Sequence, residues 1–106
     1  MADEPALPSE EELREALDRV GVGDILVNAL SAAASIGFRR VSAEARDLEQ
    51  VKLAIESLRA LDPVLRAGGV DDAIVRDLEQ ARANLQLAYA SAIGEAASDI
   101  PERPDA

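Results

Sequence analysis

The stretch that decides the fold is residues 71–92, DDAIVRDLEQARANLQLAYASA. Apolar residues recur in it at alternating spacings of four and three, which is typical of helices in bundles and coiled coils. They are Ile74, Leu78, Ala81, Leu85, Ala88 and Ala92. Asp71 is the expected N-cap of this helix, and Val70 can pack on Val75 as a hydrophobic staple. The stretch therefore predicts a long helix with one apolar face.

A second helix is predicted just before it, from its N-cap Asp47 to the glycine pair Gly68 and Gly69. Its apolar face consists of Leu48, Val51, Ile55, Leu58 and Leu65. Because a residue that precedes proline avoids the α region, we expect a kink or restart at Asp62, before Pro63. The glycine pair separates the two helices, which should form an antiparallel hairpin.

A third helix is expected over residues 24–36, with Asp24 as its cap and Gly37 as its stop. Its polar residues form one narrow stripe of Asp24, Asn28, Ser31 and Ser35. A helix that is apolar around most of its circumference is normally buried on several sides. We therefore expect this helix to be central and to be shared across a dimer axis. Residues 38–46 are predicted to be a polar connection.

An amphipathic helix is predicted at the N-terminal end, where Ser9 and Glu12 have the spacing of a capping box. Its apolar face contains Leu13, Ala16, Leu17 and Val20. Gly21 and Gly23 end it. This helix either docks on the other helices or binds a groove on a partner, and the sequence leaves both alternatives open.

Composition supports an all-α fold, a small bundle of three to four helices that ends in an antiparallel hairpin. The 106 residues are 48% hydrophobic, Phe38 and Tyr89 are the only aromatic residues, and helix formers dominate. We expect a disordered acidic tail over residues 1–8, one helical domain over 9–95 and a disordered tail over 96–106. A core rich in alanine buries little area, so a homodimer is the expected way to complete it.

Charge and residue types exclude several classes of function. The formal net charge is −10, which argues against nucleic-acid binding and against docking on anionic membranes. The chain has no cysteine and no histidine, so a thiolate nucleophile, the usual general base and the usual metal ligand are missing. We expect a cytoplasmic protein that is not an enzyme and needs no cofactor or metal, and that binds an unknown protein partner.

The candidate contacts with a partner are the apolar residues of the first helix and the only concentration of positive charge. They are Leu13, Leu17, Val20, Arg39, Arg40 and Arg46. A different alternative is a helical enzyme or binder that holds an anionic metabolite between helices. Its candidate residues are Arg39, Arg40, Arg59, Arg66, Arg76 and Arg82. A third alternative is an acidic surface that masks a basic protein.

Two segments carry a family resemblance, DLEQVKLAIESL at residues 47–58 and LQLAY at residues 85–89. Together with the helix rich in small apolar residues before them, they resemble the domain of unknown function eighteen forty-four, a bacterial family of small helical proteins. The resemblance covers residues 24–92. It implies a small-residue helix, a loop, a helix that opens on an acidic-Leu-Glu run and a final helix that ends near a tyrosine. The family has no established activity, so no catalytic residue is implied.

Overall fold

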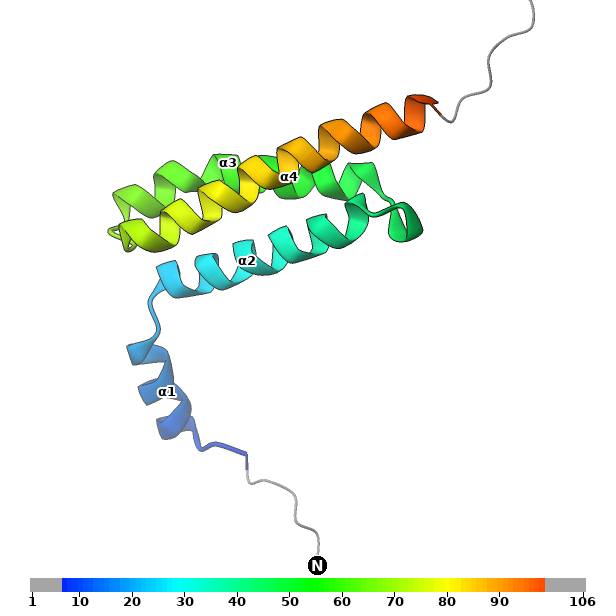
Figure 1. The fold of residues 1–106 in the computed structure, drawn as a ribbon. Helices are drawn as coiled ribbons and strands as arrows, with labels where there is room; N and C mark the ends of the chain where they lie inside the picture. The colour runs from blue at the N-terminus through cyan, green and yellow to red at the C-terminus, as the bar shows by residue number, and fades with distance from the viewer. Residues whose placement is uncertain (1–6, 99–106) are drawn as a thin grey trace, which may run out of the picture.

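The computed structural model describes residues 7–98, and these residues are helical apart from short connections. The helices are α1 (Glu10–Arg19), α2 (Val22–Val41), the short 3-10 helix η1 (Ala43–Ala45), α3 (Leu48–Ala67) and α4 (Asp72–Ser98). Figure 1 shows α2, α3 and α4 side by side as a three-helix bundle, with α1 projecting from one end. The predicted all-α bundle with a final antiparallel hairpin is confirmed.

The core of the bundle lies between α2, α3 and α4, each of which packs on the other two. One cluster of buried residues occupies the end near the α3–α4 turn, and it consists of Leu30, Ala34, Leu58, Leu65, Val75 and Leu78. A second cluster occupies the other end and consists of Val51, Ala54, Ile55 and Leu85, with Tyr89 packed against it. No polar or charged residue is buried in the described part of the chain, so apolar packing is the main source of stability.

The predicted limits of α2 are wrong at both ends. Gly21, not Asp24, is the N-cap, and the Asp24 carboxylate accepts a hydrogen bond from the Gly21 N–H at 3.2 Å. The helix also continues through Gly37 to Val41, and η1 follows at Ala43–Ala45, so most of the expected connection is helical. A Cβ atom at Gly37 would lie 2.7 Å from a methyl group of Leu85. Gly37 is therefore a point of close helix approach rather than a helix stop.

The restart that is one alternative predicted at Asp62 is absent, because α3 is one continuous helix through Pro63. Proline removes one backbone hydrogen bond and crowds the preceding turn. The buried residues Leu58 and Leu65 lie on either side of Pro63 and belong to the same core cluster. Packing on both sides therefore keeps the helix continuous. Asp47 caps its start as predicted, accepting from the Gln50 N–H.

The helix α4 follows the predicted pattern with one shift in phase. Leu78, Leu85 and Ala92 are buried as expected, but Ile74 is exposed and Val75 takes its place in the core. Asp71 accepts a hydrogen bond from the Ala73 N–H, which confirms the predicted cap. The helix extends to Ser98, three residues beyond the boundary expected at residue 95. Residues 99–106 of the predicted tail, and 1–6 of the other, lie outside the described residues.

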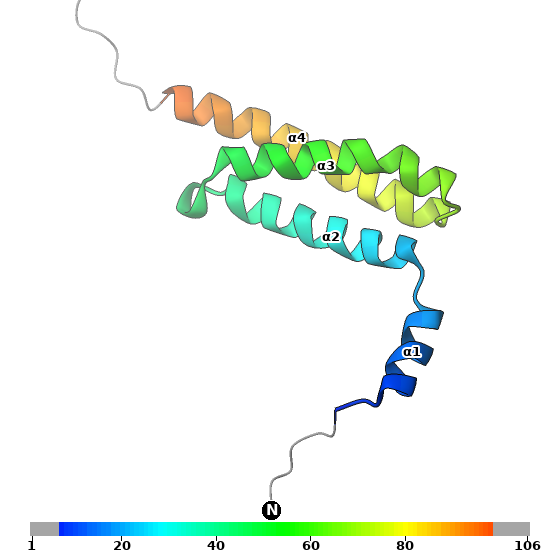
Figure 2. The same ribbon diagram turned by 180° about the vertical axis from the view of Figure 1, so that it is seen from behind.

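The helix α1 stands apart from the bundle in both views (Figures 1 and 2). Ser9 caps it by accepting from the Glu12 N–H at 3.1 Å, as predicted. Its axis is bent by 81° from that of α2, and none of its residues is buried. A ten-residue helix without packing is marginal in water, so the Ser9 cap is the main local stabilisation that α1 has.

Candidate interaction surface

The side of α2 that faces away from α4 carries an apolar stripe in contact with solvent. Val22, Ile25, Ala29, Ala32 and Ile36 lie on this side at helical spacing and are all exposed. Ile25 and Ile36 expose 56% and 54% of their surface. The expectation that α2 is buried on several sides is therefore wrong for the isolated chain, because α3 and α4 cover only its inner side, at Leu30, Ala34 and Gly37.

The helix α3 extends this stripe sideways with two large apolar residues. Leu53 and Val64 expose 60% and 51% of their surface and lie eleven residues apart, three helical turns, as Ile25 and Ile36 do. Because α2 and α3 are antiparallel, Leu53 lies across from Ile36, and Val64 lies across from Ile25. Together these residues and the α2 stripe form what we call the α2–α3 face: Val22, Ile25, Ala29, Ala32, Ile36, Leu53 and Val64.

A shallow groove of about 200 Å³ crosses the α2–α3 face between α2 and α3. It is lined by Ala33, Ile36, Gln50, Leu53, Ala54 and Ser57. No charged residue lines the groove, and α2 has no charged residue between Ile25 and Phe38. A soluble protein seldom leaves a continuous uncharged apolar surface open unless that surface makes contact with something. The face is therefore the strongest candidate for a site of interaction.

Sequence reasoning missed the contribution of α3 to this face. Leu53 and Val64 lie outside the inward stripe of Val51, Ile55 and Leu58, and the sequence pattern assigns them no role. Their spacing of eleven residues was the available signal. It became informative only once the antiparallel packing of α2 and α3 placed them opposite Ile36 and Ile25.

The predicted contact residues of α1 are accessible. Leu13, Leu17 and Val20 expose 48%, 69% and 47% of their surface, and α1 makes no substantial contact with the bundle. In the structure, α1 is therefore not docked on the bundle of its own chain. It offers a second apolar surface, separate from the α2–α3 face.

The three predicted contact arginines have different environments. Arg39 and Arg40 are exposed in the last turn of α2, where their charge offsets the negative end of the helix dipole. Arg46 is instead engaged within the chain. Its guanidinium donates to the Val41 carbonyl and to Glu95 Oε2, the latter at 2.7 Å. Arg46 therefore ties the segment before α3 to α4.

The arginines named for an anionic ligand do not converge on a site. Arg82 is half-buried, and the other five are exposed: Arg39, Arg40, Arg59, Arg66 and Arg76. Arg66 lies among three carboxylates, those of Asp62, Asp72 and Glu79, and its charge is compensated by them. The anionic-metabolite alternative gains no support from this arrangement.

A cleft larger than the groove on the α2–α3 face lies at the end of the bundle, between the start of α2 and the α3–α4 turn. Its volume is about 490 Å³, and its lining includes Asp24 and Asp71 but no basic residue. Both carboxylates already accept backbone hydrogen bonds at helix starts, from the Gly21 and Ala73 N–H groups. Within residues 7–98 no group of three or more histidine, cysteine, aspartate or glutamate side chains could hold a metal ion. The cleft therefore offers no chemistry that we can assign.

Comparison with known proteins gives no relative. No family model, no curated protein and no solved structure matches the chain. The resemblance to the domain of unknown function eighteen forty-four stays a prediction. In the described part of the chain, no single helix has both the length and the hydropathy to cross a membrane; α1 and α2 meet these criteria only as a pair, and that pair is bent.

Proposed function

We propose that the protein is a non-enzymatic helical interaction module that binds protein through the α2–α3 face and forms a homodimer. The observation that carries the proposal is the uncharged apolar surface on α2 and α3, where Ile25, Ile36, Leu53 and Val64 are each more than half exposed. Covering a large apolar side chain contributes roughly 1.5–3 kcal/mol. A partner that covers this face would thus gain a substantial contact energy.

The shape of the face indicates the kind of partner. Two parallel ridges of side chains with a groove between them suit a helix that lays its own apolar stripe along the groove. The partner therefore presents an amphipathic helix rather than a flat or strongly basic surface. The masking of a basic protein by acidic residues is not favoured, because the exposed apolar face itself carries no charge.

A pair of matched variants tests the proposal. Leu53→Glu places a charge on the face in the lining of its groove, whereas Leu87→Glu makes the same change on α4, where Leu87 is 72% exposed and does not line the groove. Both residues are exposed, so both variants should fold. The tagged full chain and each tagged variant would be used to capture proteins from source-cell lysate. In a separate assay, untagged copies of the chain would be added, and the amount of captured untagged chain would be measured.

We expect Leu53→Glu to abolish capture of a second copy or of another protein, and Leu87→Glu to leave capture unchanged. Equal capture by all three proteins would contradict the assignment of the face. Failure of the unmodified chain to capture any protein, its own copies included, would contradict the interaction function as a whole.

A further inference from the structure

The exposed stripe of α2 has a spacing that is the same in both directions. Ile25, Ala29, Ala32 and Ile36 are separated by four, three and four residues, the heptad spacing of a coiled-coil seam. From either end the order is isoleucine, alanine, alanine, isoleucine. We infer that two copies of the chain pair their α2 helices antiparallel along this stripe, with Ile25 of each copy facing Ile36 of the other. This inference rests on the proposed function and specifies its partner.

In this register the large residues of one copy face large residues of the other, and small residues face small ones. It places Ala29 of one copy opposite Ala32 of the other at the two-fold axis, so the helix backbones can approach closely at the centre. At each end, Ile25 of the second copy lies beside Ile36 and above the groove that Ile36 forms with Leu53. The groove then serves as the hole that receives an isoleucine knob. Both copies make the same contacts, as a two-fold interface requires.

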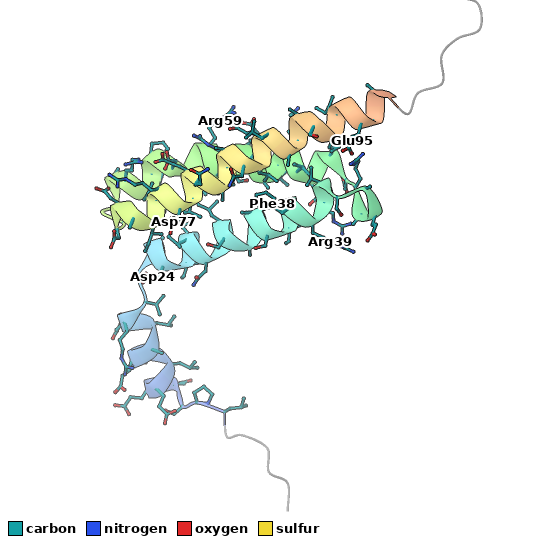
Figure 3. All side chains as sticks on the ribbon, in the orientation of Figure 1. Asp24, Phe38, Arg39, Arg59, Asp77 and Glu95 are labelled. Carbon is teal, nitrogen blue, oxygen red and sulfur yellow. The ribbon has the colours of Figure 1, made fainter. Side chains whose placement is uncertain are left out.

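The charges at the two ends of α2 favour the antiparallel pairing over a parallel one. Asp24 lies at the start of the helix and Arg39 at its end, as Figure 3 shows, with Arg40 next to it. In the antiparallel register, Arg39 of one copy falls opposite Val22 of the other, within two residues of Asp24. A parallel pair would instead oppose Arg39 to Arg39 and Asp24 to Asp24. Opposed helix dipoles add to the same preference.

The α1 helix of the same chain is the other candidate to cover the stripe, and it is too short. A ten-residue helix spans about 15 Å, half the length of α2. If α1 folded back at Gly21 it would reach the middle of α2 and leave Ile36 and Leu53 uncovered. In the structure α1 also points away from the bundle. A second copy covers the full length of the stripe, whereas α1 does not.

Cysteine cross-linking tests the register directly, because the chain has no cysteine of its own. Equal amounts of Ile25→Cys and Ile36→Cys protein would be mixed, oxidised and digested, and the linked peptides would be identified by mass spectrometry. The antiparallel register predicts mainly 25–36 links. Residues 25 and 25 of the two copies would lie about 16 Å apart along the axis, beyond the roughly 7 Å between Cα atoms that a disulfide allows. Ser35→Cys, on the polar side of α2, replaces Ile36→Cys in the control and should not link to position 25.

A second pair of variants measures the dimer itself by sedimentation equilibrium. Ala32→Glu places two carboxylates beside the axis and should raise the dissociation constant by roughly 100-fold or more. Ser31→Glu changes the net charge equally, one residue away on the polar stripe, and should alter the constant by less than about threefold. Both positions are exposed in the single chain, so both variants should keep the helix content of the unmodified protein.

The outcomes separate this inference from the proposed function. Mainly 25–36 links together with loss of the dimer in Ala32→Glu support both. A dimer with 25–25 and 36–36 links would overturn the antiparallel register. A chain that is monomeric at all concentrations would overturn the pairing of copies. If that monomer still captured another protein in a Leu53-dependent manner, the interaction function would stand, with the face binding a different protein instead of a second copy.

Discussion

Gly37→Ala tests whether α2, α3 and α4 meet as closely as the structure shows. In an ordinary helix interior, replacing glycine by alanine stabilises by about 1 kcal/mol. Here the new Cβ would lie 2.7 Å from a methyl carbon of Leu85 and 3.2 Å from the Cβ of Ala54. Leu85 is fully buried and Ala54 has no torsion that can move its Cβ away, so neither side chain can retreat easily. Overpacking should lower the free energy of unfolding by about 2 kcal/mol, and the better helix propensity of alanine should raise it by about 1 kcal/mol. The net effect is a loss of about 1 kcal/mol of stability.

The measurement is urea unfolding followed by circular dichroism at one fixed protein concentration, so that any dimer affects all variants equally. Gly94→Ala is the matched control, because Gly94 also lies inside a helix and a Cβ there meets no atom within 4 Å. We expect this control to stabilise by up to about 1 kcal/mol. The two substitutions should therefore differ by about 2 kcal/mol and have opposite signs. Equal stabilisation by both would refute the close approach.

Leu85→Ala extends the same test. Alone it should destabilise by about 2–5 kcal/mol, because Leu85 is fully buried in the second core cluster. It also removes the methyl groups that would clash with a Cβ atom at position 37. In the Leu85→Ala background, Gly37→Ala should therefore lose most of its cost, because only the 3.2 Å approach to the Cβ of Ala54 still opposes the helix-propensity gain of about 1 kcal/mol. A loss of the same size in both backgrounds would show that Leu85 is not the group that excludes a side chain at position 37.

Three further predictions concern the ends of the bundle. Ser9→Ala should lower the helix content of α1, because the cap contributes about 1 kcal/mol to that helix, and should leave the unfolding midpoint of the bundle unchanged, because α1 does not pack on it. Circular dichroism measures the helix content, and urea unfolding measures the midpoint. Removing residues 1–20 should shift the thermal midpoint of the bundle by less than about 4 °C, and a larger fall would show that α1 docks on the bundle in solution. Asp71→Ala should cost about 1 kcal/mol in urea unfolding, because Asp71 caps α4, and Asp71→Asn should recover most of that loss.

The number and order of the helices were predictable because their start signals are local. Ser9, Asp47 and Asp71 each precede a run of helix formers and each accepts a hydrogen bond from the backbone of the helix that follows. The wrong predictions concern residues whose local sequence is compatible with two structural roles. Only contacts with residues far away in the sequence decide between these roles. Glycine commonly ends helices, so the local sequence favours a helix stop at Gly37. Its role depends on Leu85, which is far away in the sequence and meets it only in the folded chain.

The candidate site was only half predictable for a related reason. The sequence showed that α2 is apolar around most of its circumference, but not which side α3 and α4 would cover. That depends on how the inner residues of three helices pack together. Once Leu30, Ala34 and Gly37 were placed inside, Ile25 and Ile36 had to lie outside. Arg46 shows the same limit, because its ion pair with Glu95 joins residues that no local pattern connects.

The distribution of charge also favours contact with protein on the outer side of α2. The chain carries a net charge of −10, and both α3 and α4 bear charged residues along their exposed sides. A solvent-facing helix surface accepts such residues at little cost in stability. Yet α2 has none between Ile25 and Phe38, although much of that segment is exposed. Packing inside the bundle requires apolar residues only on the inner side of α2, so it does not account for the isoleucines and alanines on the outer side. Contact with a second α2 helix accounts for both the missing charges and the reversible spacing of Ile25, Ala29, Ala32 and Ile36.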